Sequence, residues 1–178
     1  ANLEETETYA FQGTKIAAID APKLRVIGAA AFSMMTELKS FTFYPTLEEV
    51  GMMPFIESGV EHFYVANNTS STATINDYAF VENDAIYIKL ANGNIQLQAY
   101  APMCKAEQLV VKEGTVRIEL FAGSENTYLK SVVLPDSLEY IGQSAFRNCT
   151  SLESVEFKSF NAPKLESSHN KNDSLSET

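Results

Sequence analysis

The feature that most constrains the fold of this chain is a repeat of short triplets, each reading apolar, any residue, apolar. The first residues of successive triplets lie 22 or 23 positions apart. Seven triplets follow this period: Ile19–Ala21, Phe41–Phe43, Phe63–Val65, Ile86–Ile88, Leu109–Val111, Val132–Leu134 and Val155–Phe157. A fixed period of about 20–50 residues is typical of a solenoid, whose turns stack and bury one continuous core. We therefore expect an extended surface rather than an enclosed catalytic pocket.

Each repeat also carries a small residue and an aromatic ring ahead of its triplet. Residues 24–43 and 138–157 are the clearest copies, and they share a glycine (Gly28, Gly142) and an alanine (Ala31, Ala145). The recurring aromatic residues are Phe11, Phe32, Phe55, Phe80, Tyr100, Phe121 and Phe146. We expect these rings to stack from one turn to the next and to form a continuous hydrophobic spine.

The triplets alternate with a period of two, which predicts short strands. Strands one repeat apart are expected to stack in parallel at about 4.8 Å. The dipeptide Asn92-Gly93 lies between two alternating apolar runs and is also compatible with a hairpin. Because the constant period places these runs on opposite sides of one coil, we favour a regular coil over residues 83–102, with a protruding hairpin as the alternative.

One run resembles the BspA-type leucine-rich repeat, whose consensus places Leu-Pro, Leu, Ile-Gly, Ala-Phe, Cys and Leu in this order. The matching residues are Leu134, Pro135, Leu138, Ile141, Gly142, Ala145, Phe146, Cys149 and Leu152. The resemblance covers roughly residues 6–165 and is strongest over 134–157, good over 21–65 and looser over 66–130. Residues 83–102 resemble a divergent rung of this family.

The resemblance implies a leucine-rich-repeat right-handed solenoid of about seven coils. It would be rich in β-structure, with a parallel sheet on the concave side and short helical turns or short strands on the convex side. The resemblance also implies a secreted or cell-surface protein, because characterised members act as adhesins that bind matrix proteins or other cells. It transfers neither a catalytic residue nor a cofactor.

Composition narrows the functional classes. The chain has 178 residues, of which 45% are hydrophobic, and a net charge of −10. This charge argues against nucleic acid and anionic membranes as partners. No apolar run reaches the roughly 18 residues of a membrane span, and the chain opens without a signal peptide. We expect one solenoid domain over residues 1–165 that starts in mid-repeat as part of a longer protein, and a polar flexible tail over 166–178.

The chain contains two cysteines and two histidines, the residue types that most often supply nucleophiles or metal ligands. Cys104 and Cys149 lie two rungs apart, about 10 Å by strand spacing, which is too far for a disulfide. We therefore expect two buried thiols, with a reactive thiol as the weaker alternative. His62 precedes a triplet and is expected at the surface, whereas His169 lies in the tail, so neither predicts a metal site or a cofactor.

The middle residues of the triplets form a column on the open face of the expected sheet: Asp20, Thr42, Tyr64, Tyr87, Val110, Val133 and Glu156. We expect them to face solvent because the apolar pair of each triplet faces inward. The candidate partner-binding residues are Thr42, Tyr44, His62, Tyr64, Tyr87, Val110 and Val133. An exposed apolar and aromatic stripe is typical of a binding surface. The preference of strands for such residues explains the same pattern without a ligand.

A second column places three acids on successive rungs: Glu61, Asp84 and Glu107. Stacked like charges destabilise a sheet, so these carboxylates form a weak candidate site for a cation or a basic partner. A solvated acidic edge is the alternative.

These observations leave three functions open. The first is a non-enzymatic adhesion module that binds a protein or glycan at a host or neighbouring cell through the concave sheet, with self-association as an addition. The second is a structural spacer that displays another domain. The third is a polysaccharide-acting β-helix enzyme, which needs clustered acids and bases on one face. Within the column of Glu61, Asp84 and Glu107 no basic neighbour accompanies the acids.

Overall fold

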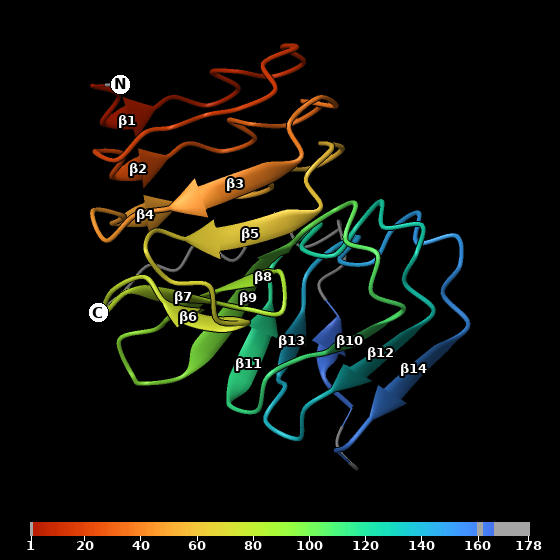
Figure 1. Cartoon of the computed structure of the whole chain (residues 1–178). Coiled ribbons are helices and arrows are strands. Elements are labelled where there is room, and N and C mark those ends of the chain that lie inside the picture. The colour runs from red at the N-terminus through yellow and green to blue at the C-terminus, as the bar shows by residue number, and fades with distance from the viewer. Residues whose placement is uncertain (1, 160–161, 166–178) are drawn as a thin grey trace, which may run out of the picture.

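The computed structural model describes residues 2–159 and 162–165, and the tail expected over 166–178 lies outside these residues. The described residues form a β-solenoid of about seven turns, and no helix occurs among them (Figure 1). The expected fold class is therefore confirmed. In the same ranges, no helix has the length and apolar character that crossing a bilayer requires.

Each turn carries two strand positions. The first position is occupied by β1 (Glu5–Thr6), β2 (Val26–Ile27), β4 (Glu49–Val50), β9 (Ile95–Tyr100), β11 (Thr115–Ile118), β13 (Tyr140–Ile141) and β15 (Lys164–Leu165). The second position, that of the triplets, is occupied by β3 (Ser40–Phe43), β5 (His62–Val65), β10 (Gln108–Val110), β12 (Ser131–Leu134) and β14 (Ser154–Phe157). We call the surface formed by these five strands the triplet face.

The triplet strands pair in the register that the sequence period predicts. Phe41 lies opposite Phe63, and Val132 lies opposite Val155, in parallel ladders. In β3, alternation buries Phe41 and Phe43 and leaves Thr42 between them half-buried. In this strand a period of two therefore sends the apolar pair of the triplet into the core and its middle residue towards the surface. In β14 the apolar pair Val155 and Phe157 is instead exposed, at 41% and 49%.

The aromatic spine is only partly continuous. The ring of Phe32 stacks on Phe11 at 5.7 Å and on Phe55 at 5.5 Å between centroids, as expected. The next ring, Phe80, leaves this stack and lies on Tyr87 at 5.1 Å. The spine ends at Phe55 because the chain inserts an antiparallel segment after the third turn.

This insertion is the main correction to the sequence analysis. It consists of β6 (Thr72–Thr74), β7 (Ala79–Glu82) and β8 (Ala85–Lys89), which pair antiparallel with one another and with β9. Residues 86–88 therefore lie in a hairpin arm, and the regular coil that we favoured over residues 83–102 is wrong. The hairpin alternative is confirmed: the Leu90 amide donates to Asn94 O at 2.8 Å around Gly93, whose φ is +84°.

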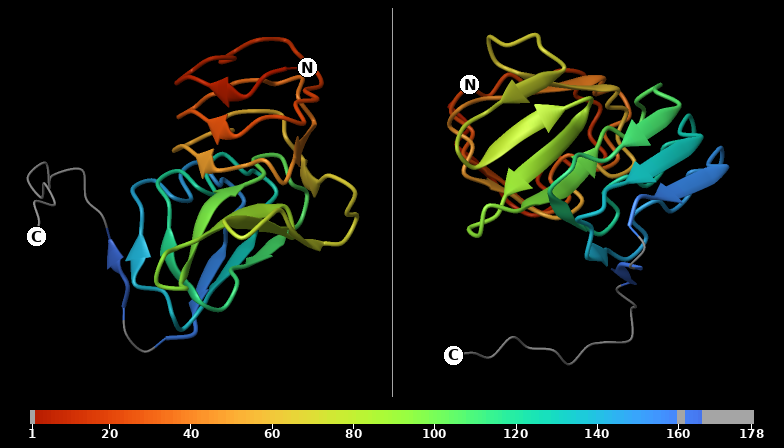
Figure 2. Two further views of the ribbon diagram at one scale, coloured as in Figure 1. Left: turned by 90° about the vertical axis from the view of Figure 1, so that its left-hand side faces the viewer. Right: turned by 90° about the horizontal axis from the view of Figure 1, so that it is seen from below.

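The turns consequently form two blocks on either side of the insertion. Figure 2 shows the first turns as one stack and the later turns as another, with the inserted strands between them. The strands of the second block run in a different direction from those of the first (Figure 1). One hydrophobic core nevertheless extends through both blocks and includes Phe55, Tyr87 and Leu97.

Both cysteines are free and buried, as expected. Cys104 lies at the junction of the two blocks, and Cys149 donates its thiol hydrogen to Gly123 O at 3.1 Å in the second block. Burial of both thiols within the core explains why the repeat tolerates cysteine at this corner.

Candidate binding groove

The insertion divides the triplet face into two separate sheets. One sheet contains β3 and β5 and ends at β5, and the other contains β10, β12 and β14 and begins at β10. We call the boundary between β5 and β10 the seam. A groove of about 450 Å³ opens along it, with His62, Tyr64, Asp84, Gln108 and Val110 among its lining residues. The insertion thus converts a continuous sheet surface into a concave site.

Most of the candidate binding residues lie where the sequence placed them. Tyr64 and Val110 are exposed, at 46% and 49%, and face the groove from β5 and β10. The His62 ring lies 5.9 Å from that of Tyr64 on the same strand. Thr42 and Val133 are half-buried on the strands next to the groove. These residues form a partly aromatic surface that continues across the seam.

Tyr44 is half-buried and makes a contact within the chain. Its hydroxyl donates to the Asp20 carboxylate at 2.6 Å, and this hydrogen bond raises the pKa of Tyr44 above its usual value. The side chain is therefore tied to the preceding turn of the first block.

Tyr87 is not part of the surface, and the expectation that it is exposed is wrong. It lies in β8 with 1% of its surface exposed, and its hydroxyl accepts a hydrogen bond from the Lys112 amide at 3.3 Å. The antiparallel hairpin carries Tyr87 into the core, where it stacks on Phe80. Burial, opposed by the hydrogen bond from the Lys112 amide, raises the pKa of Tyr87 to about 12 from an ordinary value of 10.0.

We expect this shift to make the fold sensitive to alkali. An unfolded chain releases the Tyr87 proton near pH 10, whereas the folded chain retains it until about pH 12. The contribution to the free energy of unfolding is complete below pH 10 and falls by about 3 kcal/mol as the pH rises through 12. Urea titrations of the native chain between these pH values should show this loss, and Tyr87→Phe should show a shallower one. Equal slopes would contradict the assignment.

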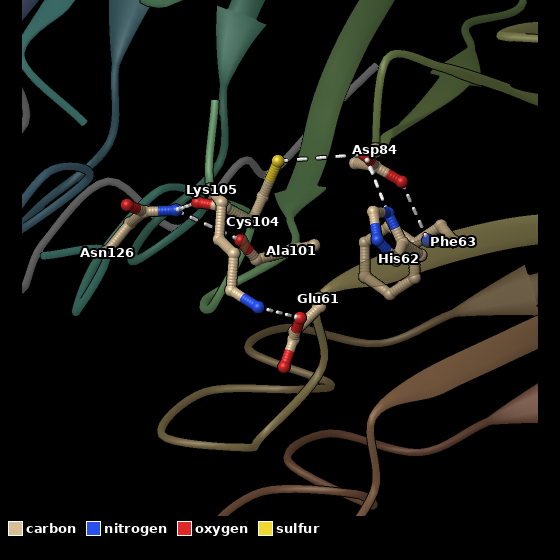
Figure 3. Close-up of polar contacts among 8 residues, drawn as sticks. All are labelled: Glu61, His62, Phe63, Asp84, Ala101, Cys104, Lys105 and Asn126. Atoms are coloured by element: carbon tan, nitrogen blue, oxygen red, sulfur yellow. Dashed lines mark hydrogen bonds and ion pairs between the residues drawn. The ribbon is translucent and has the colours of Figure 1, made fainter. Parts of the chain in front are cut away.

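The carboxylate of Asp84 contacts residues on both sides of the seam (Figure 3). Its Oδ1 accepts a hydrogen bond from the Phe63 amide at 3.1 Å, and its Oδ2 lies 3.2 Å from His62 Nδ1 and 3.6 Å from Cys104 Sγ. The carboxylate therefore joins β5 of the first block to the segment that enters β10. Asn83 and Asp84 make the two-residue turn between β7 and β8, with φ values of 49° and 60°. Such a turn requires positive φ at both positions, which asparagine and aspartate tolerate.

The three acids of the second column do not converge. Glu61 pairs with Lys105 at 2.7 Å across the seam, Glu107 pairs with Lys130 at 2.7 Å within the second block, and Asp84 contacts His62 and the Phe63 amide. The hydrogen bond from Lys105 lowers the pKa of Glu61. Among residues 2–159 and 162–165, no group of three or more His, Cys, Asp and Glu side chains is arranged to hold a metal ion. The column is therefore a series of separate ion pairs.

A nucleophilic triad contains the same three side-chain types as Cys104, Asp84 and His62. The contacts among these three residues differ from those of a triad. A thiol nucleophile needs a base that takes its proton, whereas here the thiol and the imidazole both contact the same carboxylate. Cys104 is 3% exposed, and burial raises the pKa of its thiol. The neutral thiol is favoured, so this geometry supports a structural role for Cys104.

Away from the groove, side chains of the second block and of the insertion also bond to the first block. Gln98 Nε2 donates to Val50 O at 3.1 Å and to Gly51 O at 2.9 Å. Asn76 Nδ2 donates to Pro45 O at 3.0 Å. These residues were missed in the sequence because their partners lie 31 to 48 positions away. The Asn83-Asp84 dipeptide between two apolar runs was a usable signal for the turn that positions Asp84.

Comparison with known proteins agrees with this architecture. The sequence matches the family described as BspA type leucine rich repeat region over residues 4–101 and 93–177, in six copies. A comparison with curated proteins finds no match.

Three solved structures are similar in fold. A leucine-rich-repeat protein from Eubacterium ventriosum has a TM-score of 0.63 at 15% identity, covering 89% of this chain and 45% of that protein. The pneumococcal vaccine antigen PcpA has a TM-score of 0.60 at 21% identity, covering 86% and 42%. A leucine-rich cell surface protein from Faecalibacterium prausnitzii has a TM-score of 0.50 at 15% identity, covering 85% and 62%.

The chain spans less than two thirds of the length of each of these structures. At these identities the likeness concerns the fold, and the family assignment comes from the repeat sequence. Because the family match extends over nearly the whole sequence, the chain belongs to the BspA-type leucine-rich-repeat family.

Proposed function

We propose that this chain is a non-enzymatic binding module of a secreted or cell-surface protein, and that the groove at the seam holds its ligand. The ligand is a protein or glycan on a host or neighbouring cell. The observation that carries the proposal is the groove itself, about 450 Å³ in volume and flanked by the exposed side chains of His62, Tyr64 and Val110. Exposed aromatic rings beside a concave surface are typical of recognition sites.

Two further observations support this function. The F. prausnitzii structure of similar fold is a cell surface protein, and PcpA is a vaccine antigen. The seam also holds its cysteine as a buried thiol with a raised pKa, which suits a structural element better than a catalytic one. We therefore assign the seam to binding.

The charges of the groove and of the whole chain indicate which class of ligand is favoured. Asp84 is the only Asp, Glu, Lys or Arg among the groove-lining residues, all of which belong to the described part of the chain. The whole chain carries a net charge of −10. A neutral or basic ligand is favoured, because an acidic ligand would approach both a negative protein and a negative groove.

The test is binding of the purified chain to an array of matrix proteins, mucins and glycans. We expect Tyr64→Glu to lower affinity for the bound ligand at least about tenfold, because it places a charge at the exposed ring of the groove. Tyr9→Glu is the matched control, since Tyr9 is 54% exposed in the first turn and does not line the groove. Circular dichroism should confirm that both variants remain folded.

The outcomes separate the functions. Loss of binding in Tyr64→Glu alone supports recognition at the groove. Equal binding by both variants would place recognition elsewhere on the solenoid. A native chain that binds nothing on the array would favour a structural spacer over a binding module.

A further inference from the structure

The edge of β10 that faces the groove has its backbone groups oriented for pairing. On the opposite edge, the Val111 amide donates to Val133 O at 2.9 Å, and the Ser131 amide donates to Glu107 O at 3.0 Å. Residues 107, 109 and 111 therefore direct their backbone groups towards β12. Because successive residues of a strand point to opposite edges, Gln108 and Val110 direct theirs towards the groove.

This edge is limited at both ends by contacts within the chain. The Lys112 amide is taken by the Tyr87 hydroxyl at 3.3 Å, and before β10 the Met103 amide donates to Val60 O at 2.9 Å. Between these contacts, the amides and carbonyls of Gln108 and Val110 have no hydrogen-bond partner among the residues that the structure describes. They offer two donors and two acceptors, alternating with the spacing of a β-ladder.

The opposite wall of the groove is less available. The Phe63 amide of β5 is occupied by Asp84 Oδ1, and Val65 O accepts the Asn68 amide at 3.0 Å as the chain turns away. The two strands are joined near their starts through Val60 and Met103, and they belong to separate sheets beyond that point. A guest strand would therefore pair with β10 and lie against the side chains of β5.

We propose that the groove binds an extended peptide segment of a partner protein, which adds as a strand beside β10. This proposal rests on the proposed function, because it takes the groove as the recognition site. Backbone pairing of a peptide with an open strand edge is an established mode of recognition. A peptide matches the four alternating backbone groups, whereas a glycan would depend mainly on the surrounding side chains.

Charge indicates the kind of segment. Asp84 lies at the end of the groove formed by the Asn83-Asp84 turn, and its side chain is 23% exposed. The remaining walls contribute neutral groups such as Tyr64, Val110 and Gln108. The preferred segment is therefore neutral or carries a lysine or arginine near Asp84.

The first experiment measures the edge without a ligand. Amide hydrogen exchange by NMR should show slow exchange for Leu109 and Val111 and fast exchange for Gln108 and Val110. Slow exchange at Val110 in the unliganded chain would mean that the edge is already paired, and would overturn the proposal.

The second experiment uses a random octapeptide library displayed on phage and panned against the folded chain. Selected peptides should protect the Val110 amide from exchange, and methylation of their alternate backbone nitrogens should abolish binding. Val110→Pro should lower their affinity at least about tenfold, because it removes a donor and fills its place with the proline ring. This amide points away from β12, so proline is compatible with the β10–β12 ladder. Val110→Thr is the matched control and should retain affinity within about twofold, since it keeps the amide.

Each outcome decides between the two proposals. Peptides that bind Val110→Pro as well as the native chain, or a library that yields no binder, would overturn strand addition. A glycan-array ligand that is lost in Tyr64→Glu but retained in Val110→Pro would also overturn it while leaving the proposed function intact. Ligands whose binding is unaffected by either substitution would overturn both the groove as the binding site and strand addition.

Discussion

Gly59→Ala is expected to lower the free energy of unfolding by more than about 3 kcal/mol. A Cβ atom at this position would overlap the carbonyl oxygen of Thr36 on the preceding turn and would lie 2.8 Å from its carbonyl carbon. The Gly59 amide also donates to Met35 O at 3.0 Å, which holds the two turns at this distance. Relief of the overlap requires the turns to separate, and Val60, Met35 and Leu38 beside it are fully buried.

A matched glycine separates this packing effect from a backbone effect. Gly13 has a φ of +67°, and a Cβ atom there would meet nothing within 4 Å. Gly13→Ala should therefore cost only about 1 kcal/mol, which reflects the strain of alanine in the left-handed region. Urea denaturation followed by circular dichroism measures both variants. Equal costs would show that the turns do not stack as closely as described.

Asn126→Leu is expected to destabilise the chain by about 3–5 kcal/mol. Asn126 is fully buried at the start of the loop that leads to β12. Its Nδ2 donates to Ala101 O at 3.3 Å and to Cys104 O at 2.9 Å, and its Oδ1 accepts the amides of Tyr128 and Leu129, both at 2.9 Å. Leucine has a similar size but leaves Cys104 O and the amides of Tyr128 and Leu129 without partners in the core, where each costs free energy. Ala101 O keeps the hydrogen bond from the Cys104 amide at 3.1 Å.

Asn76 provides the comparison, because it makes the same set of contacts in a half-buried position. Its Nδ2 donates to the carbonyls of Pro45 and Leu47, and its Oδ1 accepts the amides of Tyr78 and Ala79. We expect Asn76→Leu to cost less than Asn126→Leu in the same urea measurement, because water can reach part of the site. A larger cost at Asn76 would contradict burial as the cause.

The sequence predicted the repeat geometry well because solenoid packing imposes a period on it. The register of Phe41 with Phe63 and of Val132 with Val155 follows directly from the spacing of the triplets. The exposure of Tyr64 and Val110 follows from alternation within each strand.

The sequence did not predict whether a strand pairs in a parallel or an antiparallel direction. Alternating apolar residues fit parallel and antiparallel strands equally, so residues 86–88 kept the period while lying in an antiparallel hairpin. That hairpin buries Tyr87 and brings Asp84 to His62. These contacts join residues more than 20 positions apart and depend on how the insertion packs between the blocks, which no local pattern encodes.

The division of the triplet face has a mechanical consequence. Within each block, neighbouring turns are joined by parallel backbone ladders, so bending there breaks several hydrogen bonds together. At the seam, β5 and β10 end separate sheets, and side chains such as Asp84 and Lys105 make much of the connection. Individual side chains can reorient without unpairing a strand, so we expect any bending between the two blocks to occur at the seam. A peptide strand that pairs with β10 and packs against the side chains of β5 would add contacts across the seam, so binding would also be expected to limit such bending.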